Sequence, residues 1–260
     1  MISRINLHAK PTYNEVQNMK WGIIDVIIVY ALVLIIVTLA TLIIILPAMR
    51  DFLNSSAIPS SDISNLSHFY YVKARQLVVV RGLIEQLCLA FLPIFWVKIR
   101  KYGGIKNLGL SFENVIRNSV VGIICGVGFR YIFITITDLL NSNSISRMAN
   151  IRVIESNIFL YIANFVRVII IGPIGESILF PGFTFPAFAK KFGPRIGVGI
   201  TALLFVLAHT HLYYANKVPL QLFCFFFMEI IAILLYLRTK SLITTVVFHA
   251  IYNALIFIGI

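Results

Sequence analysis

The stretch IFLYIANFVRVIIIGPIGESILFPGFTFPAF, from Ile158 to Phe188, is apolar or small at nearly every position. At 1.5 Å per residue of helix, about 20 such residues cross the ~30 Å hydrocarbon core of a bilayer. Within it lies Glu176, between Gly175 and Ser177 and with prolines on both sides. An ionisable group in hydrocarbon is costly and must face a bundle interior, pair with another group or line a wet cavity. The stretch therefore predicts a membrane span that carries a functional acid.

The rest of the chain has the same apolar character. Of its 260 residues, 59% are hydrophobic and only 12% are charged, which is far more apolar than a soluble domain. We therefore expect an all-α polytopic transmembrane bundle of about seven spans. The predicted spans cover residues 21–49, 77–98, 118–140, 156–188, 195–212, 218–237 and 242–259.

The net charge of +12 would suit a nucleic-acid partner only if the basic residues formed a patch on a soluble surface. Here they sort by membrane side instead. With the N-terminus inside, 13 lysines and arginines fall in inside segments, 6 in outside segments and 3 within spans. Cytoplasmic segments carry such an excess. The sequence predicts a bilayer as a partner, no nucleic acid, and an integral membrane protein with its N-terminus inside and its C-terminus outside.

The chain divides into three predicted parts. Residues 1–20 are polar and form a cytoplasmic N-terminal segment, which lacks the apolar core of a secretory signal. Residues 21–155 hold the first spans and their loops. Residues 156–260 form a tight series of four spans with short loops, and we expect this part to carry the chemistry.

Several ionisable side chains within the predicted spans have ordinary explanations. The acids in these spans are Asp25, Glu85, Asp138, Glu176 and Glu229. Asp25 and Asp138 lie near span ends and can reach the membrane interface. Arg81 and Glu85 are four residues apart on one helix face, which predicts an ion pair within the helix.

Glu229 has several possible environments in its span. It could pair with Arg167, stay protonated or face a cavity. The sequence leaves both a structural and a functional role open for it.

Two histidines lie at predicted depths compatible with that of Glu176. Glu176 is about 18 Å from the cytoplasmic end of its span, His209 about 21 Å from Arg195, and His249 about 10 Å from the start of its span. Asn253 follows His249 by one helical turn on the same face. We expect these side chains from three spans to meet in one layer below the cytoplasmic surface.

A carboxylate and two imidazoles suit the hydrolysis of an acyl bond. Glu176 with His209 can take a proton from water, and His249 with Asn253 can donate hydrogen bonds to the oxygen that becomes negative. The alternative is that these polar groups merely satisfy one another within a helical core.

At these residues the sequence resembles the CAAX protease and bacteriocin-processing (Abi) family of intramembrane endopeptidases. Its pattern is Glu-Glu-x-x-x-Arg, then Phe-x-x-x-His, then His-x-x-x-Asn. FVLAH supplies Phe205 and His209, and HAIYN supplies His249 and Asn253. The similarity covers roughly residues 156–258. It implies a CAAX-protease-like core and an endopeptidase acting on a membrane-associated peptide or protein, with Glu176, His209, His249 and Asn253 as catalytic residues.

The first motif departs from this pattern. ESILFP keeps Glu176, which the resemblance implies is the water-activating residue, but Ser177 replaces the second glutamate and Pro181 replaces the arginine. Proline cannot donate a hydrogen bond in place of a guanidinium. An altered protease and a catalytically silent regulator of membrane partners therefore both remain open. A transporter is a third class, suggested by charged residues and broken helices within the spans.

The same residues raise the question of a metal. Glu176, His209 and His249 could form a three-ligand zinc site, but no His-Glu-x-x-His helix is present. The resemblance favours metal-free activation of water, so we expect no cofactor. His211 lies on another helix face from His209 and is not expected to act directly. The resemblance and the short chain also suggest the cytoplasmic membrane of a bacterium.

Overall fold

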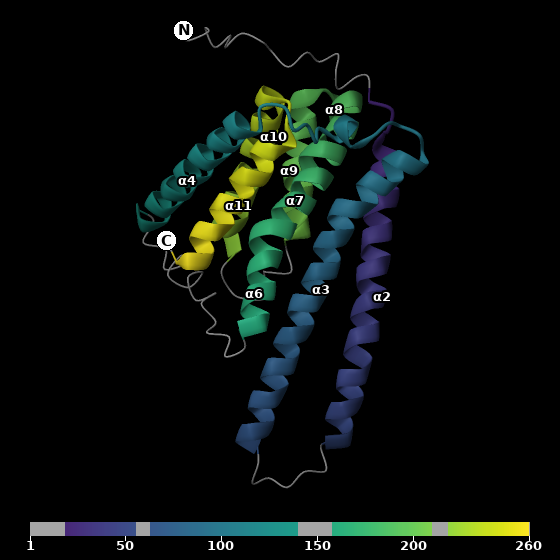
Figure 1. Ribbon diagram of the computed structural model, residues 1–260, viewed down its shortest axis with the longest axis vertical. Helices are drawn as coiled ribbons and strands as arrows, with labels where there is room; N and C mark the ends of the chain where they lie inside the picture. Colours follow the sequence, from purple (N-terminus) through teal and green to yellow (C-terminus); the bar gives the residue numbers. More distant parts are fainter. Residues whose placement is uncertain (1–18, 56–62, 140–157, 210–217, 260) are drawn as a thin grey trace.

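The computed structural model describes residues 19–55, 63–139, 158–209 and 218–259, and every regular element within them is helical (Figure 1). The predicted all-α class is confirmed. The elements, in chain order, are α2 (Ile23–Ser55), α3 (Ile63–Ile99), η2 (Ile105–Leu108), α4 (Val115–Leu139), α6 (Ile158–Val166), η4 (Arg167–Ile171), α7 (Gly172–Ser177), η5 (Ile178–Thr184), α8 (Phe185–Phe192), α9 (Pro194–Ala208), α10 (Val218–Thr239) and α11 (Leu242–Ile258).

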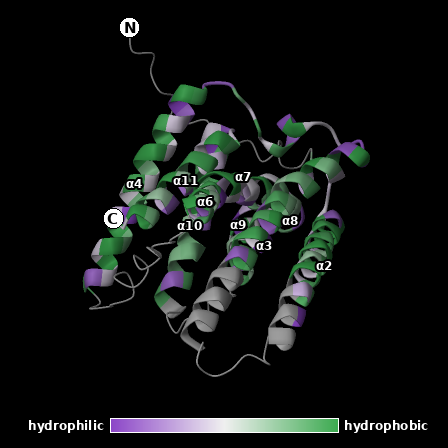
Figure 2. Cartoon of the chain, turned by 60° about the horizontal axis from the view of Figure 1, so that its bottom comes forward, coloured by the Kyte–Doolittle hydropathy of each residue, from purple (hydrophilic) through white to green (hydrophobic). Residues whose placement is uncertain are grey.

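Five helical segments are long and apolar enough to cross a membrane. They are Ile23–Ile44, Gln76–Ile99, Val115–Leu139, Ile158–Phe192 and Leu220–Thr239, and the shorter apolar helices Pro194–Ala208 and Leu242–Ile258 accompany them. Each of the seven predicted spans thus corresponds to an apolar helical segment. Only 17% to 33% of each long segment is buried inside the protein, so most of its surface faces outward, and hydrophobic residues run along most of these helices (Figure 2). The protein is an integral membrane protein. The inside location of its N-terminus stays a prediction.

The first two helices are longer than predicted. The sequence analysis ended the first span at residue 49 and began the second at 77, whereas α2 continues to Ser55 and α3 begins at Ile63. Hydropathy marks only the apolar part of a helix, and backbone hydrogen bonding continues into the polar flanks. The two helices run side by side and project beyond the rest of the bundle (Figure 1).

Small residues bring α4 and α11 into close contact. A Cβ atom at Gly122 would lie 2.7 Å from the carbonyl oxygen of Thr244, and one at Gly126 would lie 2.9 Å from that of Phe248. Helices in membranes associate through such close backbone approach because burial of apolar surface drives little association in lipid. This contact holds α11, and with it His249, against the bundle.

The fourth span is continuous but irregular around Glu176, where its glycines and prolines lie. Two π-helical segments, η4 and η5, flank the six-residue helix α7. Pro173 and Pro181 have no N–H to donate, and their rings would clash with the carbonyl four residues earlier in a regular α-helix. Widening to π geometry relieves this clash, and π-bulges are frequent at functional sites.

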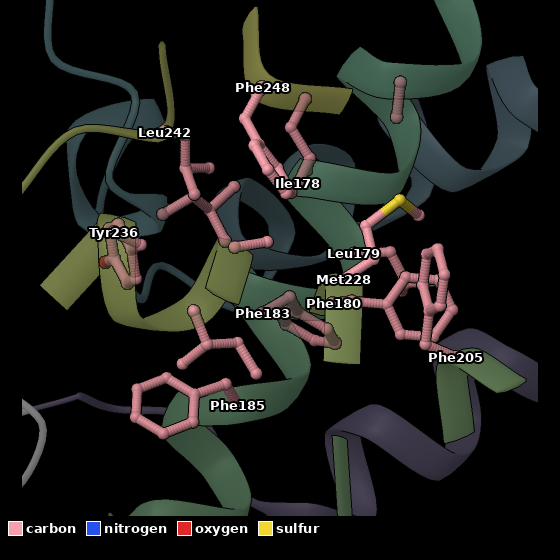
Figure 3. Packing of buried hydrophobic residues seen from close by; sticks show 14 of the residues in the cluster. Ile178, Leu179, Phe180, Phe183, Phe185, Phe205, Met228, Tyr236, Leu242 and Phe248 are labelled. Carbon is pink, nitrogen blue, oxygen red and sulfur yellow. The ribbon is translucent and has the colours of Figure 1, made fainter. Parts of the chain in front are cut away.

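The hydrophobic core lies around η5. Figure 3 shows Ile178, Phe180, Phe183, Phe205 and Phe248 packed together, and all five are at most 1% exposed. Trp21, just before α2, adds a hydrogen bond to this core. Its Nε1 donates to the carbonyl oxygen of Phe183 at 2.8 Å. The core thus fixes the segment that follows Glu176 directly.

Candidate active site

Three helices bring the predicted carboxylate and imidazoles together. Glu176 lies on α7, His209 caps the C-terminus of α9 and His249 lies on α11. His209 Nε2 lies 3.8 Å from Glu176 Oε1, and His249 Nδ1 lies 3.7 Å from Glu176 Oε2. The predicted convergence of these three residues is therefore present in the fold.

One ring nitrogen of His209 forms a hydrogen bond with the backbone. Its Nδ1 lies 2.8 Å from the carbonyl oxygen of Phe205, and a carbonyl can only accept, so Nδ1 carries the proton. In the neutral imidazole Nε2 is then the unprotonated nitrogen, and it faces Glu176. Two acceptors facing each other at 3.8 Å are suited to sharing one water molecule, which can donate a proton to each.

His249 lies between two acids. Its Nδ1 faces Glu176, while its Nε2 lies 3.9 Å from Glu229 Oε2 on α10. His249 and Glu229 are both 0% exposed. Of the three environments considered for Glu229, pairing with Arg167 is not observed, because the ionisable group beside it is His249.

Asn253 is anchored to the irregular part of the fourth span. Its Nδ2 donates to the carbonyl oxygen of Val168, in η4, at 3.0 Å. The amide has a second N–H that this bond does not use. Asn253 also lines the cavity described next.

A cavity of about 330 Å³ opens onto the site. Its walls include Glu176, His209, Asn253, Gln86, Gln221 and Arg167, together with apolar side chains such as Phe225 and Met228. His249 and Glu229 are not among the described residues that line it. A mostly apolar cavity with a few convergent polar groups is typical of a substrate site.

Among the other ionisable residues within spans, one predicted pair is confirmed. Arg81 Nη2 and Glu85 Oε2 form the predicted i,i+4 ion pair at 3.8 Å. Asp25, near the start of α2, accepts hydrogen bonds from Gly22 N at 2.8 Å and Trp96 Nε1 at 2.9 Å. Asp138 is exposed near the end of α4. His211 lies outside the described residues.

The two departures from the first motif are both buried. Ser177 is 0% exposed, and its Oγ has no hydrogen-bond partner among the described residues. Pro181 is buried within η5. Neither side chain supplies an ionic contact to the site, so the ionic contacts around Glu176 come from other helices.

The site contains donor types that zinc binds, a carboxylate and two imidazoles. Across the described parts of the chain, no group of three or more His, Cys, Asp or Glu side chains is arranged to hold a metal ion. The metal-free site expected from the sequence stays a prediction.

Sequence reasoning missed two features of the site. It did not connect Glu229 with His249, because no spacing rule relates α10 to α11. It also missed the aromatic packing: Phe205 lies 4.4 Å from His209 and 5.8 Å from His249 between ring centroids, and Phe225 lies 4.8 Å from His209. Phe205 precedes His209 by four residues, and this helical spacing could have predicted the contact between their rings.

Comparison with known proteins points to the same part of the chain. Residues 158–255 match the family model for type II CAAX prenyl endopeptidase Rce1-like proteins. Neither the curated proteins nor the solved structures gave a match. The matched segment begins with α6, ends within α11 and holds Glu176, His209, His249 and Asn253. Residues 158–255 of this chain are therefore similar to the Rce1-like family of type II CAAX prenyl endopeptidases.

Proposed function

We propose that this protein is an intramembrane endopeptidase that hydrolyses a peptide bond of a membrane-associated protein or peptide. The observation that carries the proposal is the approach of His209 and His249 to opposite oxygens of Glu176, at 3.8 Å and 3.7 Å, beside a cavity. The match to a CAAX prenyl endopeptidase family supports the same reaction class. With the N-terminus inside, the cut would fall near the cytoplasmic leaflet.

In the proposed mechanism Glu176 and Nε2 of His209 hold one water molecule between them. Glu176 takes a proton as the water oxygen attacks the scissile carbonyl carbon, and the carbonyl oxygen becomes negative. The proton then passes from Glu176 to the leaving nitrogen as the C–N bond breaks, which yields a carboxylic acid and an amine, and the acid then gives its proton to the amine. General base catalysis of this kind contributes about 10²–10⁴-fold in rate.

The oxyanion donors proposed are Asn253 and His249. Asn253 lies on the cavity wall and has a second N–H to offer. His249 is not among the described residues that line the cavity, and its Nδ1 faces Glu176, so its contact with a substrate oxygen requires the cavity to deepen when the peptide enters. Catalytic hydrogen bonds are often long in the free enzyme and tighten in the complex.

The test compares Glu176→Gln with Glu85→Gln. Both acids line the cavity, so each variant replaces one cavity-lining carboxylate with an amide. The purified protein in proteoliposomes is given a fluorescence-quenched farnesylated peptide ending in Cys-aliphatic-aliphatic-X, the class of C-terminus that is prenylated. In parallel, peptides released from membranes holding wild-type or variant protein are compared by mass spectrometry.

We expect Glu176→Gln to abolish cleavage while thermal unfolding stays nearly unchanged, and Glu85→Gln to keep most of the turnover. Wild-type turnover by Glu176→Gln would overturn the assignment. The runner-up is a catalytically silent family member that regulates membrane partners, favoured by Ser177 and Pro181. Identical peptide profiles for wild-type and Glu176→Gln membranes, with no cleavage of the farnesylated peptide, would establish it instead.

A further inference from the structure

Glu229 is a buried acid that the proposed mechanism does not use. It is 0% exposed, and among the described residues neither of its oxygens has a hydrogen-bond partner. Its Oε2 lies 3.9 Å from His249 Nε2, on the face of the imidazole that points away from Glu176. Both ring nitrogens of His249 also lack a hydrogen-bond partner in the described structure.

The charges around Glu229 disfavour a second carboxylate ion. Its electrostatic neighbours are His249, Glu176 and the hydroxyl of Tyr30. Glu176 must be ionised to accept a proton, and an ionised Glu229 would place a second negative charge across the same imidazole. An isolated buried carboxylate costs many kcal/mol, whereas a neutral carboxylic acid can donate a hydrogen bond at much lower cost.

We propose that Glu229 is a positioning residue that carries its own proton and donates it in a hydrogen bond to Nε2 of His249. This inference rests on the proposed function and deepens it. Because the bond made by one ring nitrogen decides which nitrogen holds the proton, His249 then carries its proton on Nδ1. That N–H faces Glu176 and the space where the oxyanion would form.

The geometry needs only a small adjustment to make this bond. The 3.9 Å separation is about 1 Å longer than a hydrogen bond. Both side chains are enclosed in the core, where Phe205 and Phe248 pack beside the imidazole, with ring centroids 5.8 Å and 5.5 Å from it. Apolar neighbours on these sides leave Glu229 as the polar partner of Nε2.

Two substitutions separate this role from others. Glutamine at position 229 can still donate to Nε2 without a charge, whereas methionine fills a similar volume without any donor. We expect Glu229→Gln to keep turnover near wild type. We expect Glu229→Met to lower kcat by about 10–100-fold, the usual effect of losing an outer hydrogen-bond partner of a functional histidine, with KM nearly unchanged. Equal damage in both variants, or wild-type kcat in both, would overturn the proposal.

A measurement that does not depend on activity completes the test. Histidine is labelled with ¹⁵N in the full chain in lipid nanodiscs, and the His249 signals are assigned by their loss in His249→Gln. We expect the Nδ1-protonated tautomer in the wild type and in Glu229→Gln, and a loss of that preference in Glu229→Met. A proton on Nε2 in the wild type would overturn the proposal. Because this spectrum is informative even if no peptide is cleaved, failure of the proposed function and failure of the Glu229 role are distinguishable.

Discussion

Gly175 lies directly against the backbone of Gln86. A Cβ atom at Gly175 would lie 2.6 Å from the carbonyl oxygen of Gln86 and 3.2 Å from the Cβ atom of Leu89. The helix that carries Glu176 can therefore touch α3 only because the residue before the acid has no side chain. This contact fixes how closely α7 lies against α3.

Gly175→Ala tests that contact. Alanine normally stabilises a helix by about 0.5–1 kcal/mol relative to glycine, but here the added methyl group meets backbone and must move α7 away from α3. We expect a loss of about 1–3 kcal/mol in the free energy of unfolding, as for other overpacked cores, and a larger fractional loss of turnover. Thermal unfolding in detergent micelles measures the first. Gly128→Ala, where a Cβ atom meets nothing within 4 Å, is the control, and equal stability of the two variants would contradict the expectation.

Asn253→Asp tests the proposed oxyanion donor. The substitution keeps the size of the side chain but replaces both N–H donors with an acceptor, and it also removes the bond to Val168 O. We expect kcat to fall by about 10²–10³-fold, the range for loss of one oxyanion donor. Steady-state kinetics on the farnesylated peptide measure it. Gln221→Glu makes the same change on the same cavity wall, and an equal fall in that variant would show that added negative charge alone is responsible.

Asp25→Ala tests a structural anchor at the end of the bundle opposite the α2–α3 connection. Without this carboxylate, Trp96 Nε1 and Gly22 N lose their acceptor. Leaving such donors unsatisfied costs about 1–3 kcal/mol, so we expect a lower unfolding temperature. Asp138→Ala serves as the control, because Asp138 is exposed at a helix C-terminus, where an acid is unfavourable. Unfolding of Asp138→Ala at an equal or lower temperature would refute the anchor role.

Chelation tests the metal-free mechanism. We expect turnover and unfolding temperature to stay unchanged after dialysis against a strong chelator, because Glu176 and His209 activate water without a Lewis acid in the proposed mechanism. The metal content of the purified protein is measured beside the activity. Loss of turnover that zinc alone restores, with one zinc bound per chain, would show that the site rearranges to bind a metal.

The sequence alone predicted several features that the fold confirms. Long apolar segments predict helices because a backbone in hydrocarbon must satisfy its own hydrogen bonds. The irregular fourth span was predictable from Pro173 and Pro181, since the missing N–H is a local property. The approach of Glu176, His209 and His249 to one another followed from their similar depth along three spans.

The tertiary structure decided which face each helix turns toward its neighbours. Depth along a span is counted in residues, but rotation and lateral order depend on close contacts such as Gly126 against Phe248 and Gly175 against Gln86. For this reason the sequence left three environments open for Glu229, and only the packing of α10 against α11 put it beside His249. The sequence alone identifies the polar residues of the site. Which residues they contact on other helices depends on how the helices pack.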